Sequence, residues 1–359
     1  MTRALKLADI RAVFQRRRFE TLREEFYRDL WYVAAQQTGA SIRKIFSGFY
    51  EIEKGGLATF VSRSDLMLDD ILTTRIMAHK GLTYRLLAEK GFRVPDHLEF
   101  SLGNLAEAER FLFAQPGMVV VKPATGTGAG LGVTTAIATK RELRRAARYA
   151  ASFNRELLIE PHLEGSSYRL TYLDGQYLDA VRRDSPEVVG DGRTTIRNLI
   201  TLENTRRLEE RPISALHPII VDAECCTHLA RQGLSPASKP KPGQTITVKG
   251  AVNENAAAQN HSIRDLVHPD TIKAGAELVR DLGVRFAGVD LISDDIKAPF
   301  SHEGTIVSEI NVNPGIQHHY LVSDRLAGTP IAGQILNHLF ENRQGVMVLN
   351  QQNPESAAK

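Results

Sequence analysis

The chain contains only two cysteines, Cys225 and Cys226, and no long apolar run. Neighbouring cysteines have a poor geometry for a stabilising disulfide, so a disulfide framework is excluded and we expect reduced thiols. No uninterrupted apolar stretch approaches the roughly 18 residues that span a membrane. The charged N-terminus also has no secretory apolar core with a cleavage site. We therefore expect a cytoplasmic protein with no membrane partner.

Neither sign of charge is in large excess, because the chain has 45 lysines and arginines and 42 aspartates and glutamates. A balance this close to neutral does not indicate a nucleic-acid partner, although small anions remain candidates. The basic run at residues 16–18 opens a segment in which apolar residues recur at spacings of three and four, from Phe19 to Val33. We interpret this run as the solvated side of an amphipathic helix rather than a nucleic-acid patch.

The chain has 359 residues, enough for two or three domains, and its hydrophobic content of 42% fits a globular protein with buried cores. The residue patterns predict an α+β fold. Helices are expected over 16–33, over 74–89, from Asn104, from Thr139, and over 196–207 and 270–282; strands are expected over 118–121, 157–160, 168–172, 176–183, 245–248, 284–292 and 305–312. Glu107 and Glu142 follow Asn104 and Thr139 at the spacing of a capping box. Gly55-Gly56 indicates a hairpin or a loop, and Asp174-Gly175 indicates a hairpin. Residues 184–261 resist detailed assignment.

Polar side chains alternate along the last strand-like run. Glu309 and Asn311 project from one face of it, and Ile310 and Val312 project from the other. Asp290 lies in another strand-like run upstream, which two antiparallel strands would bring alongside. Hard cations such as Mg²⁺ take oxygen ligands from one or two carboxylates and complete their shell with water and phosphate oxygens. The run therefore indicates a magnesium-nucleotide site, with an exposed strand face as the alternative.

A glycine-rich loop follows the strand-like run at 118–121. From Lys122 the sequence reads Lys-Pro-Ala-Thr-Gly-Thr-Gly-Ala-Gly-Leu-Gly. Glycine lets backbone N–H groups approach an anion, and Lys122 adds a point charge, so the loop is suited to phosphates. The lysine precedes the glycines, which excludes a Walker loop, and no helix with a ribose-binding acid follows as in a dinucleotide site. The alternative is a flexible hairpin tip.

The order of these segments resembles the ATP-grasp superfamily, and most closely the ATP-grasp module of cyanophycin synthetase and related amino-acid ligases. The resemblance covers about two thirds of the chain, from Lys80 to Pro314. It rests on the segments 79–87, 94–95, 122–132, 160–163, 165–170, 188–196, 286–292 and 309–315. The segment 188–196, with Arg182-Arg183 before it, is similar to a signature that ordinary ATP-grasp enzymes lack.

The resemblance implies a set of site residues. Those expected to bind ATP are Lys80, Lys122, Gly126, Thr127, Gly128, Gly130, Gly132, Glu160, Leu163 and Ser167. Asp290, Glu309 and Asn311 are expected to hold Mg²⁺, or Mn²⁺ in its place. Lys122 and Arg183 are expected to act in catalysis, and Arg182 and His319 to contact substrate.

Some of these assignments have alternatives. The glycine loop carries one more residue than the family pattern, and Ser167 stands where relatives carry an acid, although its hydroxyl can still bond a ribose. Arg183 holds a developing phosphate or a substrate carboxylate, or else is a surface ion-pair partner. His318 and His319 either border the acceptor site or cap a loop.

The implied fold has two α+β subdomains that clasp ATP, preceded by a small N-terminal region. The expected division is 1–75 for an N-terminal α/β cap, 76–116 for a helical and linker part, 117–183 for the lid with its glycine loop, 184–345 for the C-terminal subdomain with the metal site, and 346–359 for a flexible tail.

The implied activity is that of an ATP-dependent carboxylate–amine ligase, which forms an amide through an acyl phosphate and releases ADP and phosphate. The expected substrates are an amino-acid or peptide carboxylate and an amine. A small-molecule kinase and a non-catalytic ATP-binding scaffold are the alternatives. Cyanophycin synthetase carries a further ligase domain, for which this chain ends too early. We therefore expect a stand-alone enzyme, and a homo-oligomer as in many relatives.

Overall fold

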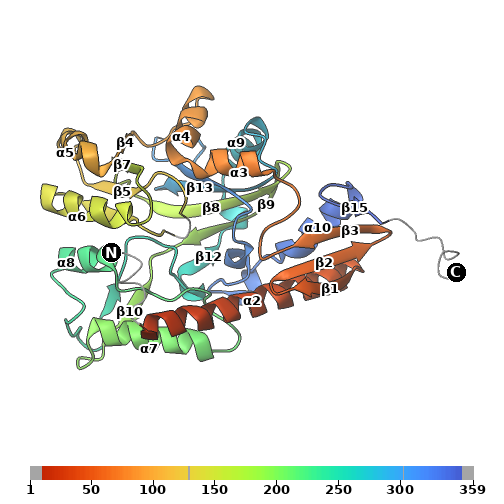
Figure 1. Ribbon diagram of the computed structural model, residues 1–359, viewed down its shortest axis with the longest axis horizontal. Helices are drawn as coiled ribbons and strands as arrows, with labels where there is room; N and C mark the ends of the chain where they lie inside the picture. Colours follow the sequence, from red (N-terminus) through yellow and green to blue (C-terminus); the bar gives the residue numbers. More distant parts are fainter. Residues whose placement is uncertain (1–9, 128–129, 302, 350–359) are drawn as a thin grey trace, which may run out of the picture.

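The computed structural model describes residues 10–127, 130–301 and 303–349. Strands in these residues form four antiparallel sheets, and helices cover them in an α+β arrangement (Figure 1). The α+β class predicted from the sequence is confirmed. None of the helices in this described part of the chain has the length and apolar character needed to cross a membrane.

The described helices are α2 (Ile10–Thr38), α3 (Ile71–Ala78), α4 (Lys80–Glu89), α5 (Leu105–Ala114), α6 (Lys140–Ala151), α7 (Ile196–Glu209), α8 (Ala223–Arg231), α9 (Pro269–Asp281) and α10 (Ile331–Glu341). The strands are β1 (Ser41–Phe46), β2 (Phe49–Lys54), β3 (Leu57–Val61), β4 (Leu98–Phe100), β5 (Val119–Pro123), β6 (Thr134–Ile137), β7 (Leu157–Pro161), β8 (Ser166–Leu173), β9 (Gln176–Arg183), β10 (Glu187–Val189), β11 (Thr245–Thr247), β12 (Asn260–Ser262), β13 (Phe286–Ser293), β14 (Ile306–Val312) and β15 (Met347–Val348). Short 3-10 turns are η1 (Leu102–Asn104), η2 (Ala257–Gln259), η3 (Arg264–Leu266), η4 (Ile316–His319) and η5 (Arg325–Ala327).

The N-terminal and C-terminal parts of the chain form one unit. The sheet order β1-β2-β3-β15 brings Met347 opposite Ala58, so residues near the C-terminus complete the sheet that the N-terminus begins. Helices α2 and α10 pack on it, and Trp31 of α2 is fully buried in their shared core. The predicted tail at 346–359 is therefore corrected for residues 347–348, because their backbone pairs with β3. The remaining tail residues, from 350, lie outside the described residues.

The lid is a four-stranded sheet in the order β4-β7-β5-β6, with α5 and α6 packed against it (Figure 1). Every residue of β5 is buried, as the continuous apolar run predicted. The capping box predicted at Thr139 and Glu142 is confirmed. The box predicted at Asn104 and Glu107 is wrong: the Asn104 carboxamide oxygen instead accepts the Ser101 backbone N–H, so the box lies one turn earlier.

The central sheet has five strands in the order β12-β9-β8-β13-β14. The predicted boundary at residue 183 divides this sheet, because β8 pairs along its whole length with β13, over a hundred residues later in the chain. The lid sheet therefore ends with β7, and 166–183 belong with the metal-ligand strands. The turn between β8 and β9 is the expected hairpin, in which Asp174 and Gly175 have positive φ angles of 48° and 72°.

The helix predicted over 74–89 is broken at His79. This residue has an extended backbone (φ −93°, ψ 99°) and caps α4 by accepting the Leu82 N–H at its ring nitrogen. The break frees the backbone N–H of Lys80, which donates to the carbonyl of Ala124 at 2.9 Å. Lys80 thus begins α4 rather than lying inside a longer helix, and it is tied to the chain just after β5.

A fourth unit covers most of the region that resisted assignment. Strands β10 and β11 pair, and α7 and α8 pack with them around a small apolar core that includes Ile196, Ile200 and Leu229. The helix predicted over 196–207 and the strand predicted near 245–248 are confirmed as α7 and β11. We call residues 184–256 the insertion lobe, because they separate β9 from β12 of the central sheet.

Candidate nucleotide and metal site

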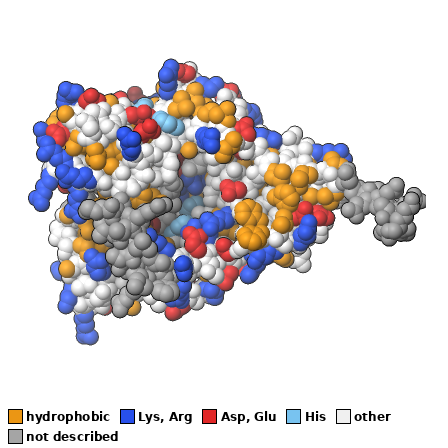
Figure 2. Space-filling view, in the orientation of Figure 1, with side chains coloured by type: hydrophobic (Ala, Val, Ile, Leu, Met, Phe, Trp, Pro, Cys, Tyr) orange, Lys and Arg blue, Asp and Glu red, His pale blue; other side chains and the backbone are white. Residues whose placement is uncertain are grey.

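A cavity of about 750 Å³ is lined by residues of the lid, of the central sheet and of the insertion lobe. Figure 2 shows a hollow in the middle of one face, with basic and histidine side chains inside it. Its volume is in the range of cavities that hold a small ligand or cofactor. Lys122 comes from the lid, Arg183 from the central sheet and Asn253 from the insertion lobe.

Two lysines from separate segments meet in this cavity. Lys80 Nζ lies 3.2 Å from Glu309 Oε1. Lys122 Nζ donates to Glu160 Oε1 at 2.6 Å and to the Tyr84 hydroxyl at 3.0 Å. Both lysine side chains are only 10% exposed. Buried ammonium groups need such partners, and they provide fixed positive charge for the phosphates of a nucleotide.

Tyr84 is a site residue that the sequence analysis missed. It lies on α4 one turn after Lys80, and its hydroxyl lies 3.0 Å from Glu160 Oε2 and 2.7 Å from the carbonyl oxygen of Ser308. Burial and the nearby carboxylates raise the pKa of Tyr84 well above its usual value, so the phenol stays protonated. Tyr84 therefore ties the strand that carries Glu160 to the strand that carries the metal-ligand candidates.

The three predicted metal ligands come together on neighbouring strands. Asp290 of β13 lies directly opposite Glu309 of β14, and Asn311 lies opposite Gly288 two residues away. Asn311 Nδ2 lies 3.3 Å from Asp290 Oδ2. Alternate residues of a strand share a face, so Glu309 and Asn311 project from the same side of β14. The pairing of β14 with β13 places Asp290 beside them, and the three side chains form one group of oxygen donors.

Asp290 is also the partner of two buried arginines. Arg169, directly opposite it on β8, donates from Nε and Nη2 to the two carboxylate oxygens, both at 2.7 Å. Arg183 Nη2 lies 3.0 Å from Asp290 Oδ2 and donates to Ser167 Oγ at 3.1 Å. Arg169 was not singled out from the sequence, because nothing within its own strand shows that β13 pairs with β8.

The two carboxyl groups are held in the ionised form. Burial raises the pKa of Asp290, but Arg169 and then Arg183 lower it by more, so its net pKa is below the usual value. Burial likewise opposes ionisation of Glu309, and Lys80 and more distant cations outweigh it, so the pKa of Glu309 is also lowered. Both groups are therefore ready to act as anionic ligands at neutral pH.

This donor set fits a magnesium ion. Two carboxylates and a carboxamide oxygen are hard ligands, and a metal with water and phosphate oxygens would complete such a shell. Two atoms in the cavity residues support an anionic ligand beside it: Arg183 Nε and His318 Nδ1 are buried and have no partner among the described residues. Buried donors of this kind are normally satisfied, so a bound anion would account for the arginine.

The glycine loop and the segment after β7 supply further parts of the wall. Thr127 and Gly130 line the cavity, and Gly130 has a positive φ of 69° that favours glycine. Gly126 and Gly132 are not among the lining residues, and Gly128 lies outside the described residues. Glu160, Leu163 and Ser167 all line the cavity, so the structure brings most of the predicted ATP-binding residues together.

The structure does not bring the two predicted substrate residues into the cavity. His319 is fully buried, and its ring nitrogens lie 2.7 Å from Asp179 Oδ2 and 2.8 Å from Thr171 Oγ1. Arg182 is on the opposite face of β9 from Arg183, and it bonds Asp184 at 3.1 Å. We correct both expectations, because packing in the core accounts for His319 and the strand alternation turns Arg182 away.

The cavity also contains residues of the insertion lobe that had no readable signal. Asp184, Ser185, His217 and the segment 250–253 line it. These residues lie in loops whose positions depend on contacts far away in sequence. No spacing rule could have brought them together.

Several side chains join the lid to the insertion lobe, among them Tyr149 with Asp222 and the buried carboxylate of Glu224. Glu224, in the first turn of α8 and 2% exposed, accepts hydrogen bonds from Thr135 N at 2.9 Å, Thr135 Oγ1 at 2.8 Å and Gly250 N at 3.0 Å. Thr135 is in β6 at the end of the glycine loop, and Gly250 begins the cavity-lining segment. Glu224 therefore joins the lid strand β6 to the segment of the insertion lobe that lines the cavity.

Sequence comparison finds relatives of this chain. The chain is 27% identical over 276 residues to cyanophycin synthetase of Trichormus variabilis, and the match covers 76% of this chain and 30% of that protein. It is 28% identical over 284 residues to the glutathione biosynthesis bifunctional protein GshAB of Mannheimia succiniciproducens, covering 77% of this chain and 36% of that protein. The chain thus spans about a third of the length of these curated relatives. No protein-family model matches it.

Among solved structures, a bifunctional glutathione synthetase from Pasteurella multocida superposes with a TM-score of 0.52 at 21% identity. The superposition covers 89% of this chain and 45% of the other. These proteins are all members of the ATP-grasp superfamily, and the chain has the fold of that superfamily.

Proposed function

We propose that this ATP-grasp chain is an ATP-dependent carboxylate–amine ligase that forms an amide or peptide bond and releases ADP and phosphate. One observation carries the proposal: Lys80 and Lys122 and the oxygen donors Asp290, Glu309 and Asn311 line a single cavity. Cations for phosphate and ligands for a metal, side by side, are the parts that phosphoryl transfer requires.

The side chains have distinct roles in this proposal. Lys80 and Lys122 hold phosphate oxygens, and Arg183 compensates the charge that spreads as the phosphoryl group moves to the substrate carboxylate. Bound to Asp290, Glu309 and Asn311, Mg²⁺ would supply Lewis acidity and neutralise phosphate charge. Transfer gives an acyl phosphate and ADP, and attack of a neutral amine on the acyl carbon then expels phosphate. No nucleophilic side chain is required.

The lid contributes by excluding water. An acyl phosphate hydrolyses readily, so a site that opens to solvent during the reaction would waste ATP. The glycine loop lies between β5 and β6 of the lid, and the contact of Glu224 with Thr135 fixes the second of these strands against the insertion lobe. This arrangement supports a closed cavity during both chemical steps.

We infer amino-acid or short-peptide substrates from the relatives. Their names describe synthesis of cyanophycin and of glutathione. Manganese in place of magnesium, assembly into a homo-oligomer and a cytoplasmic location stay predictions from the sequence.

The proposal is tested by incubating the protein with MgATP, single amino acids and dipeptides, with and without hydroxylamine. A ligase gives ADP, a hydroxamate when hydroxylamine is present, and a new amide when an amine is present. A phosphorylated product with no amide would support a small-molecule kinase instead. Absence of ADP with every pair of substrates, in protein that binds MgATP, would support a non-catalytic scaffold.

A further inference from the structure

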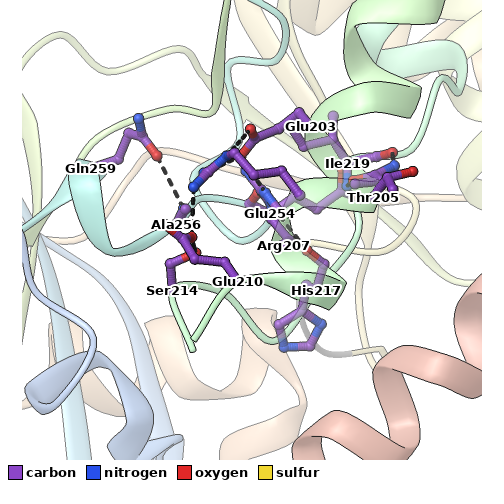
Figure 3. Close-up of polar contacts among 12 residues, drawn as sticks. Glu203, Thr205, Arg207, Glu210, Ser214, His217, Ile219, Glu254, Ala256 and Gln259 are labelled. Carbon is purple, nitrogen blue, oxygen red and sulfur yellow. Dashed lines mark hydrogen bonds and ion pairs between the residues drawn. The ribbon is translucent and has the colours of Figure 1, made fainter. Parts of the chain in front are cut away.

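His217 lies in the cavity wall on the insertion lobe, and its backbone is held by a buried arginine. Arg207 of α7 is 1% exposed, and its Nη1 donates to the carbonyl oxygens of His217 at 2.9 Å and Glu254 at 2.7 Å. Its Nε donates to Glu203 at 2.8 Å, which balances the charge. Figure 3 shows this network, with the His217 ring directed away from the guanidinium group. Arg207 therefore joins the two loops that supply His217 and the segment 250–253 to the cavity.

The ring of His217 is oriented by the N-terminal helix. Arg23 Nη2 of α2 lies 3.2 Å from His217 Nδ1 and also reaches the carbonyl oxygen of Leu216 at 3.4 Å. A guanidinium group can only donate, so Nδ1 must accept and the proton of a neutral ring must sit on Nε2. His217 Nε2 has no partner among the described residues, and the residue lines the cavity. The result is one N–H donor available to a ligand.

This donor carries no charge. Burial, then Arg23 and Arg207 and the more distant Arg63, lower the pKa of His217 to about 3. These arginines have acidic partners: Glu20 lies 3.5 Å from Arg23 and 2.7 Å from Arg63, and Glu203 lies 2.8 Å from Arg207. His217 therefore remains a neutral donor over the whole pH range in which the protein would work.

The neighbouring wall carries several uncharged polar groups beside Asp184, whose carboxylate is already bonded to Arg182 and His261. Gln317 lines the same cavity, and its side-chain oxygen accepts the Tyr27 hydroxyl at 2.5 Å. Tyr27 stands four residues after Arg23, on the same face of α2, so one helix orients both His217 and Gln317. Ser185 and the segment 250–253 add a hydroxyl and a carboxamide. Neutral donors and acceptors suit a peptide group better than a second charged group.

Building on the proposed function, we infer that His217 is a specificity-determining residue whose Nε2–H donates to a backbone carbonyl of a peptide-like acid substrate, with Arg23 as its positioning residue. Arg23 and Tyr27 of α2 contact the cavity-lining residues His217 and Gln317. The contacts of Arg23 and Tyr27 give the N-terminal helix a role in selecting the substrate, in addition to its role in packing.

Two matched probes test the inference. Glycylglycine and 5-aminopentanoate have the same termini and chain length, but only the dipeptide has a peptide group. We expect calorimetry, with Mg²⁺ and a non-hydrolysable ATP analogue present, to show that wild-type protein binds glycylglycine about tenfold more tightly, the value of one hydrogen bond. His217→Phe should abolish this preference, and His217→Gln, which keeps an N–H donor, should restore part of it.

The positioning role of Arg23 is tested through the tautomer of the His217 ring, which a change in general packing would not alter. Nitrogen-15 NMR of the histidine rings should show the Nε2–H tautomer at His217 in wild-type protein and in Arg23→Lys, but a mixture of tautomers in Arg23→Met. Arg28→Met, an exposed arginine of the same helix, is the matched control and should leave the tautomer unchanged.

Three results would overturn the inference: equal affinity of the two probes in wild-type protein, a preference that survives in His217→Phe, or no binding of glycylglycine by protein that binds the nucleotide. Failure to bind the nucleotide would be a different outcome, because it would overturn the proposed function from which the inference starts.

Discussion

At the scale of single residues, substitution of Glu309 tests whether this carboxylate belongs to a catalytic metal site or only to an ion pair with Lys80. It contacts Lys80, and it is one of three oxygen donors with Asp290 and Asn311. We expect Glu309→Gln to lower the rate of ADP formation by at least about 100-fold, because the metal and the phosphates lose an anionic ligand. Steady-state ADP release measures this, with Glu277→Gln on the exposed part of α9 as the control. Equal rates in wild-type protein and Glu309→Gln would remove Glu309 from the site.

Asp174 gives a pH-dependent contribution to stability. It accepts two hydrogen bonds from Arg285 at 2.7 Å and lies 2.6 Å from His338 Nε2. Burial raises the pKa of Asp174, but the bonds from Arg285 and His338 lower it by more, so its net pKa is below the usual value. A carboxyl group with a lowered pKa stabilises the fold above its unfolded pKa, near 3.9, and loses this contribution as the pH falls through the folded value.

Asp174→Asn should therefore lower the free energy of unfolding by about 1 kcal/mol at pH 7, a modest value because the pair is partly exposed to solvent. Asparagine tolerates the positive φ of this turn, so the hairpin is kept. Denaturant unfolding at several pH values should show the difference from wild type shrinking below about pH 4. A difference that stays constant down to pH 2 would contradict the assignment.

At the scale of elements, Glu224 joins β6 of the lid to the insertion lobe. Glu224→Gln places an amide group against the N–H groups of Thr135 and Gly250, so one or more donors lose their acceptor. We expect a loss of about 2 kcal/mol in stability and faster hydrogen exchange at these two amides, because a buried unpaired donor is costly. Hydrogen-exchange mass spectrometry of the peptides that contain Thr135 and Gly250 measures the exchange rates of these amides. Unchanged exchange there would mean that the lid is held by other contacts.

Secondary-structure features set by neighbouring residues were predicted from the sequence, whereas a feature that involves a distant partner was not. The apolar run of β5, the Thr139 cap and the Asp174-Gly175 turn are encoded by neighbouring residues, and all three were predicted. The break at His79 was missed: it leaves the Lys80 N–H to bond Ala124, a partner in another segment that the local pattern does not show.

The same division holds for the candidate site. Spacing within β14 was enough to relate Glu309 to Asn311, and the family pattern related them to Asp290 and the two lysines. Arg169 and His217 were missed, because each reaches the cavity through a partner distant in sequence: β13 for Arg169, and α2 and α7 for His217.

At the scale of the whole molecule, β15 joins a late segment of the described chain to the sheet formed by β1 to β3. Met347 and Val348 pair with β3, and the carbonyl of Gly345 accepts the Thr59 hydroxyl at 2.7 Å. A chain ending at residue 344 should be less stable by about 2 kcal/mol than a chain ending at residue 349, because β3 loses its partner strand. Thermal and denaturant unfolding of the two truncated chains measures the difference. Equal stabilities would show that this pairing adds nothing to the fold.

The proposed function depends on one physical arrangement, in which Lys80, Lys122 and three oxygen donors act on a single triphosphate. Isothermal titration calorimetry of ATP into the protein, with and without Mg²⁺, tests it most directly. We predict one ATP per chain, with binding that strengthens when Mg²⁺ is present and weakens at least about tenfold in Lys122→Met, which removes a charged phosphate contact. Folded protein that shows no affinity for ATP, or an affinity indifferent to both Mg²⁺ and Lys122, would contradict the account.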